Sequence, residues 1–225
     1  MDLRDALTRE WFRPETVRVY AQAPELTGWI DLDILVCLSG APRESVLWVS
    51  LIDRHVIQLR VKNSQILAED MIRLIFQSNE GFRFSIKNAA FAIAPAFRRL
   101  GLGARSFAIE ALAARELGLF DRIFTTALGD ASTANPQKLE NQYAGYYAWA
   151  RLGFDAVLTP DVLSRSTEEL KACRKVSELM KTESGRRFWL QYGSTVEMSF
   201  DLDVKSSCWA SLNDYMLGKG IRVFP

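Results

Sequence analysis

The sequence holds few of the residues that zinc sites and charge-relay hydrolases require. Its 225 residues include a single histidine, His55, and three widely separated cysteines, Cys37, Cys173 and Cys208. Zinc sites need clustered cysteine and histidine ligands, and a serine–histidine triad needs a histidine base. Both classes are therefore disfavoured, and no metal site is expected. An odd number of scattered cysteines also fits reduced thiols in a cytoplasm better than a disulfide framework.

Long apolar runs and an excess of one charge are also missing. No window approaches about eighteen uncharged apolar residues, the length that a membrane-spanning helix needs. The opening residues, MDLRDALTREWFRP, carry charges where a signal peptide has an apolar stretch. The chain has 28 basic and 27 acidic residues, so its balance gives no support for a nucleic-acid partner. We expect a cytoplasmic protein without a membrane partner.

The clearest strand pattern lies between residues 82 and 94. Apolar residues alternate over 82–86, and Phe91 and Ile93 alternate again in the opposite phase. A shift of one residue in a period of two is what a β-bulge produces. We therefore predict a bulged strand that ends at Pro95.

Helices and strands alternate after this strand. The apolar spacing predicts a helix over 104–117 that ends at Gly118, a strand over 122–128, and a second helix over 142–152 that ends at Gly153. This order predicts an α/β fold with a mixed sheet, of which at least part is parallel.

The pattern is less regular before residue 40. Residues 2–12 have helical spacing that Pro14 interrupts. In GWIDLDILVCL, residues 28–38, apolar residues alternate with Asp31 and Asp33, which predicts a strand with one wet face. The two aspartates would then point to solvent rather than form a catalytic pair.

Two further stretches leave alternatives open. Residues 45–62 are rich in Val, Leu and Ile and predict either one long strand or a hairpin. We interpret His55, which lies among these apolar residues, as a partly buried structural residue rather than a catalytic base. Residues 66–76 form either a helix or, in their second half, a strand that turns at 79–81.

The sequence changes character after Pro160. Residues 166–169 match a capping box that would begin a charged helix ending near Lys181. A strand is predicted over 195–203, and a final helix carries Trp209, Leu212 and Met216. We therefore expect a domain over residues 1–160 and a helix–strand–helix extension over 161–225.

A pair of glycines lies just before the helix predicted over 104–117. In RRLGLGA, Gly101 and Gly103 remove side chains from the turn, and Arg98 and Arg99 add positive charge. The start of a helix exposes unpaired N–H groups and carries the positive end of the helix dipole, so it favours an anion. The Walker pattern is not met because its Lys-Ser/Thr pair is missing, and the dinucleotide fingerprint is not met because position 106 is a serine rather than glycine or alanine.

These residues resemble the GNAT superfamily of acetyl-CoA-dependent N-acyltransferases. The family's pattern of Arg, two residues, Gly, one residue and Gly, between a bulged strand and a helix, is met by Arg98, Gly101 and Gly103. A second family element, an aromatic residue followed three residues later by Gly-Phe, is met by WARLGF, residues 149–154. The resemblance implies a GNAT-like fold and acetyl-CoA as the cofactor.

The resemblance also implies which residues hold the coenzyme. The backbone of 91–93 would pair with the pantetheine arm, and the main-chain amides of 99–104 would hold the diphosphate. The implied cofactor-binding residues are Phe91, Ala92, Ile93, Arg98, Arg99, Leu100, Gly101, Leu102, Gly103 and Ala104.

The catalytic residues depart from the family pattern. Many relatives have a tyrosine as the proton donor where this chain has Trp149, whose indole N–H does not release its proton near neutral pH. Tyr146 is the first candidate for the acid, and Tyr147 is the second. No acidic residue lies on the strand before the glycines, so deprotonation would run through water to Glu80 or Asp130, or the amine would arrive neutral.

Together these expectations describe an N-acetyltransferase that moves an acetyl group from acetyl-CoA directly to an amine acceptor of unknown class. The alternative is a catalytically inactive acyl-CoA-binding or protein-interaction module that retains the fold. The extension would either cover the acceptor or mediate association into a homodimer.

Overall fold

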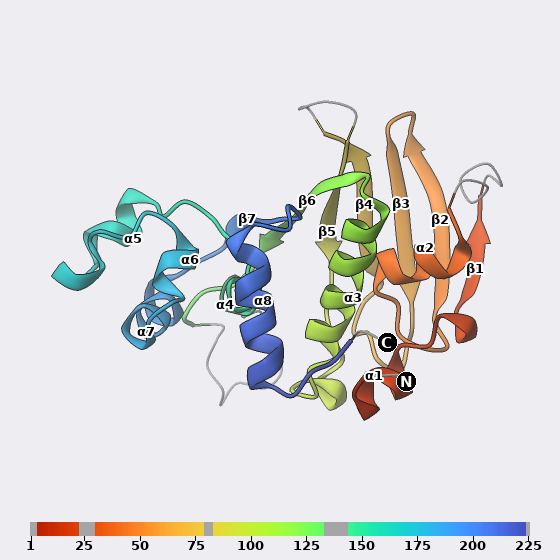
Figure 1. The fold of residues 1–225 in the computed structure, drawn as a ribbon, viewed down its shortest axis with the longest axis horizontal. Coiled ribbons are helices and arrows are strands. Elements are labelled where there is room, and N and C mark those ends of the chain that lie inside the picture. Colours follow the sequence, from red (N-terminus) through yellow and green to blue (C-terminus); the bar gives the residue numbers. More distant parts are fainter. Residues whose placement is uncertain (1–3, 23–29, 79–82, 133–143, 224–225) are drawn as a thin grey trace. The chain divides into compact units, whose positions relative to one another are not determined.

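The computed structural model describes residues 4–22, 30–78, 83–132 and 144–223 (Figure 1). The chain is an α/β protein whose strands form a mixed sheet. It divides into two compact units, Met1–Ile123 together with Met216–Pro225, and Phe124–Tyr215. These limits describe where contacts are dense, and the expected domains, 1–160 and 161–225, stay a prediction.

The first unit begins with the predicted helix. Helix α1, Ala6–Trp11, starts at Asp5, whose side chain accepts a hydrogen bond from the main-chain N–H of Thr8. A 3-10 turn, η1, follows at Pro14–Thr16, so the helix ends before the proline as expected.

The predicted strand over 28–38 is wrong. Among its described residues the chain forms helix α2, Leu32–Ser39, which Asp31 caps and which ends at Gly40 in a left-handed conformation, φ 65°. Leu35, Val36 and Leu38 are buried, and this spacing belongs to a helix. The alternation extended over too few residues to exclude a helix.

Five strands of the first unit lie in chain order in the sheet. Strand β1, Arg18–Ala21, pairs in parallel with β2, Val46–Asp53, and β2 to β5 pair antiparallel. The remaining strands of this group are β3, Val56–Lys62, β4, Met71–Gln77, and β5, Phe84–Ala90. The hairpin alternative for residues 45–62 and the strand alternative for the second half of 66–76 are thus confirmed.

We expected His55 to be partly buried, but it is exposed, in the turn between β2 and β3. Its main-chain N–H donates to Asp53 Oδ1 at 2.7 Å. The surrounding apolar residues belong to the two strands, and the turn itself lies beyond the core. The turn predicted at 79–81 falls outside the described residues.

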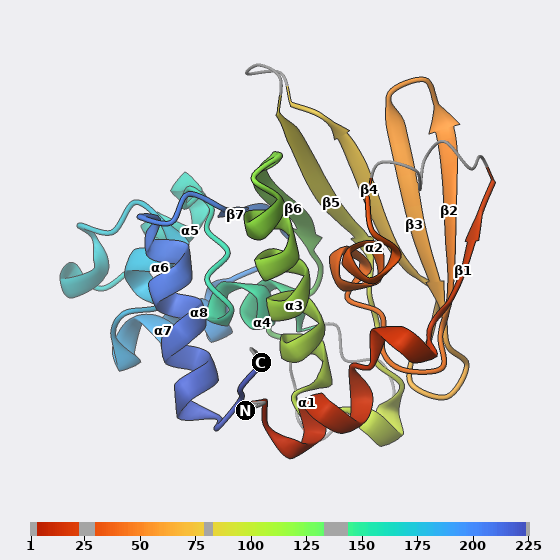
Figure 2. The same cartoon turned by 45° about the vertical axis from the view of Figure 1, so that its right-hand side comes forward.

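Helices α2 and α3 cover the same face of these strands (Figure 2). Helix α3, Leu102–Leu117, ends at Gly118 as predicted, and it buries Phe107, Ala108 and Ala111 completely. Strand residues that face the helices are also fully buried, whereas Trp48, on the other side of β2, is half-exposed. The sheet in this unit therefore has one packed face and one open face.

The predicted bulge is confirmed in β5. Ile72 pairs with Ala90, but its neighbour Arg73 pairs with Asn88, so Ala89 is the extra residue. The regular strand ends at Ala90, and the chain continues in an extended form to the 3-10 turn η3, Pro95–Phe97.

The second unit contains the C-terminal part of β6 and helix α4. Strand β6 runs over Phe120–Ala127 and begins two residues before the predicted strand, whereas α4, Gly145–Arg151, lies within the predicted helix. Strand β7, Val196–Asp201, and helix α8, Ser207–Gly218, were also predicted. Between α4 and β7 lie four short elements: α5, Pro160–Ser164, η4, Glu168–Leu170, α6, Val176–Leu179, and α7, Glu183–Tyr192.

The charged helix predicted from 166 to about Lys181 is wrong. Ser166 Oγ donates to the carbonyl of Leu163 and so belongs to the end of α5 rather than to a capping box. Two short segments, η4 and α6, replace the single helix, because Leu170, Val176 and Leu179 are buried through separate turns.

In the part of the chain that the structure describes, no helix is long and apolar enough to cross a membrane. Within the same residues, no group of three or more His, Cys, Asp and Glu side chains is placed to hold a metal ion.

Candidate functional site

In the first unit, an extended segment connects the bulged strand β5 to the turn before α3. After β5 the extended segment 91–94 lies beside residues 66–68. Ala68 N donates to Ala92 O at 2.9 Å, and Ala94 N donates to Ile66 O at 2.8 Å. Neighbouring residues of an extended chain point to opposite edges, so the N–H and C=O of Ile93 face away from this pairing.

At the outer edge of this segment, the carbonyl of Ile93 is hydrogen-bonded within the described chain but its main-chain N–H is not. The carbonyl of Ile93 accepts a hydrogen bond from Arg98 Nε at 3.0 Å. Its main-chain N–H has no acceptor among the described residues. An extended ligand with an amide group could add to this edge as a further strand would.

Residues 98–104, the glycine loop, turn sharply into the helix. Arg99 and Gly101 both have positive φ, 67° and 74°. The first backbone bond of α3 runs from Arg105 N to Gly101 O at 3.1 Å. Within the described chain, the main-chain N–H groups of 99–104 have no acceptor. A turn with left-handed residues followed by a helix start brings such groups together and favours an anion.

Arg105 holds the glycine loop from inside the protein. Its guanidinium donates to the carbonyl of Leu100 at 3.0 Å, to Thr8 Oγ1 at 3.0 Å and to Asp5 Oδ1 at 2.9 Å. The side chain of Arg105 is nearly buried, so its charge is used for structure rather than for ligand. Asp5 also accepts a hydrogen bond from the main-chain N–H of Arg222 at 2.7 Å. The loop is thus tied to both ends of the described chain.

The sequence reasoning missed Asp5 and Arg105. The position of Arg105 was a usable signal, because it lies on the face of α3 that also buries Ala108, and a charge there needs a partner. Nothing local points to Asp5 as that partner, since 100 residues separate the two.

An apolar cluster supports the loop. Trp11, Phe12, Ile66 and Leu102 form its buried part, and Ile93 and Phe97 pack against it. The ring of Phe97 meets that of Trp11 edge-on, with ring centroids 5.5 Å apart. Helix α1 therefore packs against the segment that carries the open edge and the loop.

A buried polar cluster lies at the bulge. Arg73 Nε lies 3.1 Å from Glu110 Oε2, and Asn88 Nδ2 donates to the same oxygen at 3.2 Å. Arg73 also donates to the carbonyl of Ala90, and its guanidinium lies over the ring of Phe91. Because Asn88 and Ala90 flank the extra residue of β5, this cluster holds the bulge from both sides.

Burial raises the pKa of the Glu110 carboxyl, while the Arg73 cation and the hydrogen bond from Asn88 oppose that rise. The second carboxyl oxygen, Glu110 Oε1, is buried without a hydrogen-bond partner among the described residues. Sequence reasoning missed this cluster as well, because its members come from three separate elements.

The predicted catalytic aromatics belong to the second unit. Tyr146 is fully buried, and its hydroxyl donates to the carbonyl of Leu190 at 2.6 Å. Burial raises the pKa of Tyr146 to about 12. Its main-chain carbonyl accepts from Trp189 Nε1 at 3.0 Å. Tyr146 is therefore held on both its side chain and its backbone by α7.

Tyr147 and Trp149 are half-buried. The ring of Trp149 packs edge-on against Phe154, with centroids 4.8 Å apart, and Phe154 is fully buried. Gly153 has φ 95°, and a Cβ there would collide with the carbonyl oxygen of Cys208. The WARLGF segment thus has a clear packing role in this unit.

The other predicted groups are dispersed. Glu80 lies outside the described residues. Asp130 is exposed and accepts hydrogen bonds from the main-chain N–H and the hydroxyl of Ser132. Asp31 caps α2 and accepts from the N–H of Asp33, so the two aspartates form a helix start rather than a wet strand face.

No protein-family model, curated protein or solved structure matches the chain. Any functional assignment therefore depends on the residues and their geometry.

Proposed function

We propose that the protein is a GNAT-like N-acetyltransferase that binds acetyl-CoA at the glycine loop. The observation that carries the proposal is the set of main-chain N–H groups over 99–104 that lack acceptors within the described chain, directly after a bulged strand. This set fits a doubly charged diphosphate better than a single carboxylate, because several unpaired donors follow one another in a single turn.

The pantetheine arm would extend along residues 91–93. The unpaired N–H of Ile93 supplies a donor for one of its amide oxygens. Arg98 is already bound to the carbonyl of Ile93, so its role is to shape the junction. Arg99 is exposed, and we propose that its guanidinium contacts the phosphate directly.

In the reaction, a neutral amine attacks the thioester carbon, a C–N bond forms and the C–S bond breaks. The departing thiolate takes a proton from an acid, and the amine nitrogen loses one to water. Of the three aromatic candidates we favour Tyr147 as the acid. The hydroxyl of Tyr146 already donates a hydrogen bond to the carbonyl of Leu190, and an indole N–H does not ionise near neutral pH.

A charge placed at Gly103 tests the coenzyme site. A Cβ added there would meet the ring of Phe91 at 3.6 Å and Ile93 Cγ1 at 3.9 Å, which are ordinary contacts, so Gly103→Ala and Gly103→Asp should both fold. Negative charge in the first turn stabilises a helix but repels a diphosphate. By calorimetry, we expect Gly103→Asp to bind CoA at least about tenfold more weakly than Gly103→Ala.

Gly101 is unsuitable for this test. It has φ 74°, and a Cβ there would lie 2.7 Å from Arg105 Nη1, so a substitution would disturb the support of the loop. Equal CoA affinity of the two Gly103 variants, with unchanged circular dichroism, would contradict the coenzyme site.

The commitment of Tyr146 to Leu190 also favours a second candidate, an inactive acyl-CoA-binding module. Release of CoA thiol in the presence of acetyl-CoA and a panel of amines separates the two functions. Turnover that falls on substitution Tyr147→Phe supports the enzyme. Saturable CoA binding without any thiol release supports the inactive module.

A further inference from the structure

The open face of the sheet in the first unit carries a stacked aromatic pair. Tyr20 of β1 and Trp48 of β2 are direct cross-strand neighbours. Their rings are stacked, with centroids 4.8 Å apart and planes at 21°. They remain 46% and 48% exposed, although such rings are normally covered in a folded protein. This pair has no role in the packed face, which lies on the other side of the strands.

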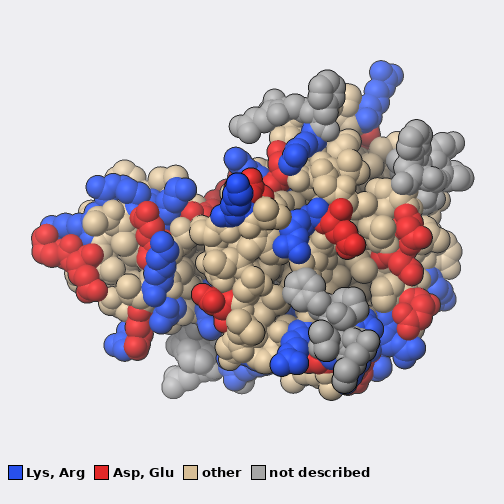
Figure 3. Space-filling view, in the orientation of Figure 1, with Lys and Arg blue, Asp and Glu red and all other residues tan. Residues whose placement is uncertain are grey.

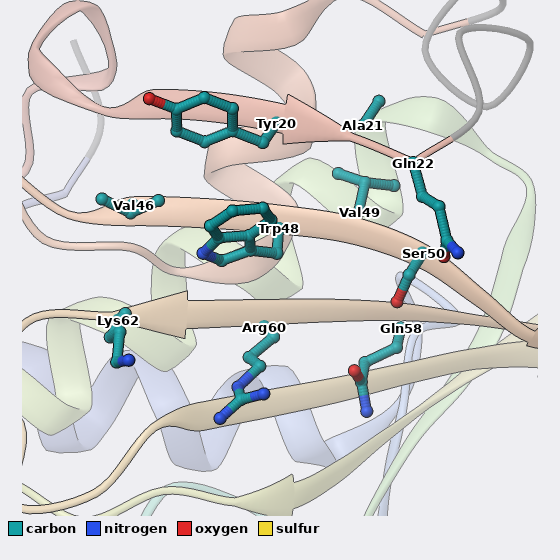
Figure 4. Close-up of a pocket in the computed structure, with 10 residues that line it drawn as sticks. All are labelled: Tyr20, Ala21, Gln22, Val46, Trp48, Val49, Ser50, Gln58, Arg60 and Lys62. Atoms are coloured by element: carbon teal, nitrogen blue, oxygen red, sulfur yellow. The ribbon is translucent and has the colours of Figure 1, made fainter.

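The pair lines a surface groove of about 680 Å³ (Figure 4). Arg60 of β3 is the next residue in the same cross-strand row, beside Trp48. Ser50 and Gln58 form the adjoining row and supply hydrogen-bonding groups. The groove therefore combines a flat apolar surface with polar groups on the same face, which suits a planar heteroaromatic ring.

Cationic side chains lie in these cross-strand rows, at Arg18, Arg60 and Lys62. Arg18 and Lys62 are both register partners of Val46 and extend the row on either side of it. No carboxylate of the described residues forms an ion pair with either, whereas Arg60 is bound to Asp70 at 2.7 Å. By contrast, both signs are interspersed over the face that Figure 3 shows. Lys62, which lines the groove, and Arg18, which lies beside it in the register, thus carry positive charge that no described carboxylate pairs with, on a chain with a net charge of +1.

A second copy of the chain fits this face poorly. A two-fold contact centred on the row that holds Arg18 and Lys62 would bring these residues towards the same residues of the other copy, and like charges at close range are unfavourable. An anionic partner with flat rings matches both the charge and the aromatic pair.

We propose that this face binds single-stranded nucleic acid, with a base stacked on the Tyr20–Trp48 pair and neighbouring phosphates bound by Lys62 and Arg18. Because the glycine loop shares no residue with this groove, the inference is independent of the proposed coenzyme site. Bases stack on aromatic rings regardless of sequence, so recognition would be broad rather than sequence-specific.

The test uses the full chain and a fluorescein-labelled RNA of about ten nucleotides, followed by anisotropy at about 50 mM salt. Trp48→Phe keeps a ring, and Trp48→Leu keeps apolar area without one. We expect Trp48→Leu to weaken binding by about 5- to 100-fold and Trp48→Phe to retain most of it. Trp48 is half-exposed, so both variants should fold. Circular dichroism and urea unfolding check that the fold is kept.

The charge contribution has a matched control. Lys62→Ala and Lys219→Ala each remove one exposed lysine from the first unit, but only Lys62 lies in the groove. The slope of log affinity against log salt is negative, and we expect Lys62→Ala to reduce its magnitude by about 0.7, the value for one phosphate contact on a single strand. Lys219→Ala should leave the slope unchanged.

Four results would overturn the proposal. The first is absence of saturable RNA binding at low salt. The second is equal affinity of the wild type and Trp48→Leu for RNA, and the third is displacement of RNA by inorganic polyphosphate at equal charge concentration; each would mean that charge alone causes binding. The fourth is self-association of the protein that Trp48→Leu abolishes, which would assign the face to a second copy.

Discussion

Arg99 has a positive φ, a conformation that among the described residues only one other non-glycine residue, Glu44, adopts. A left-handed conformation costs a residue with a Cβ about 1–2 kcal/mol. Such strain persists where the surrounding structure enforces it, and it is concentrated at functional sites. The strain at Arg99 is consistent with a loop that presents its amides to a ligand.

Arg99→Gly should therefore change stability and binding in opposite directions. Relief of the left-handed strain, less the greater chain entropy of glycine, should raise the free energy of unfolding by up to about 1 kcal/mol. Loss of the guanidinium should weaken CoA binding. Glu44→Gly is the matched control, because it relieves the same strain, at φ 60°, in the segment before β2.

Urea unfolding and calorimetry measure the two effects. Glu44→Gly should show the stability gain alone. If Arg99→Gly leaves CoA affinity at the wild-type value, Arg99 has no contact with the coenzyme.

At the scale of elements, the sequence was reliable where a pattern was long or carried strong end signals. Helix α3 and strand β7 were predicted close to their limits, and the phase shift between Ile86 and Phe91 located the bulge. Helix α2 was mistaken for a strand, because three alternating apolar residues were interpreted as a strand although Gly40, a residue that can end a helix, follows them. The short helices between Pro160 and Tyr192 were merged, because their ends depend on tertiary packing.

The contact between α3 and the bulge yields a stability prediction. Removal of one partner of a buried ion pair leaves an uncompensated charge, so Glu110→Leu should lower the free energy of unfolding by about 3–5 kcal/mol. The double variant Arg73→Met, Glu110→Leu should recover most of this loss, since apolar groups of similar size replace both charges.

Urea unfolding of the wild type, both single variants and the double variant gives the coupling between the two positions. A double variant as unstable as the worse single variant would mean that the pair is needed for the bulge itself rather than for charge compensation. In that case CoA affinity should fall as well.

At the scale of the whole molecule, Asp5 joins segments that are distant in the chain. It caps α1, binds Arg105 below the glycine loop and accepts from the main chain of Arg222. Burial by itself would raise the pKa of Asp5, but these hydrogen bonds outweigh it and lower the pKa to about 2, from an ordinary value of 3.8. Within the first unit, the carboxylate of Asp5 thus links the start of α1 to Arg105 and to the segment Met216–Pro225.

This lowered pKa predicts an acid dependence of stability. The stabilisation from Asp5 is fully present above pH 3.8, where the carboxylate is ionised in both the folded and the unfolded chain, and it is lost as pH falls towards about 2. Asp5→Asn should be less stable than the wild type at neutral pH and should lose less stability between these values. Asp214→Asn, an exposed substitution on α8, is the charge-matched control.

Urea unfolding at a series of pH values measures this difference. An acid-induced loss in Asp5→Asn as large as that in the wild type would contradict the role of Asp5.

The sequence by itself determined the order of helices and strands between residues 84 and 127, the bulge and the glycines before α3, because each depends on neighbours within a few residues of chain. Only the tertiary structure decided the partners of the polar side chains. Arg105 is paired with Asp5 rather than with a ligand, and Glu110 is paired with Arg73. The hydroxyl of Tyr146 donates to the carbonyl of Leu190. Buried polar groups take whichever partner the fold brings within reach, and that partner can lie anywhere in the sequence.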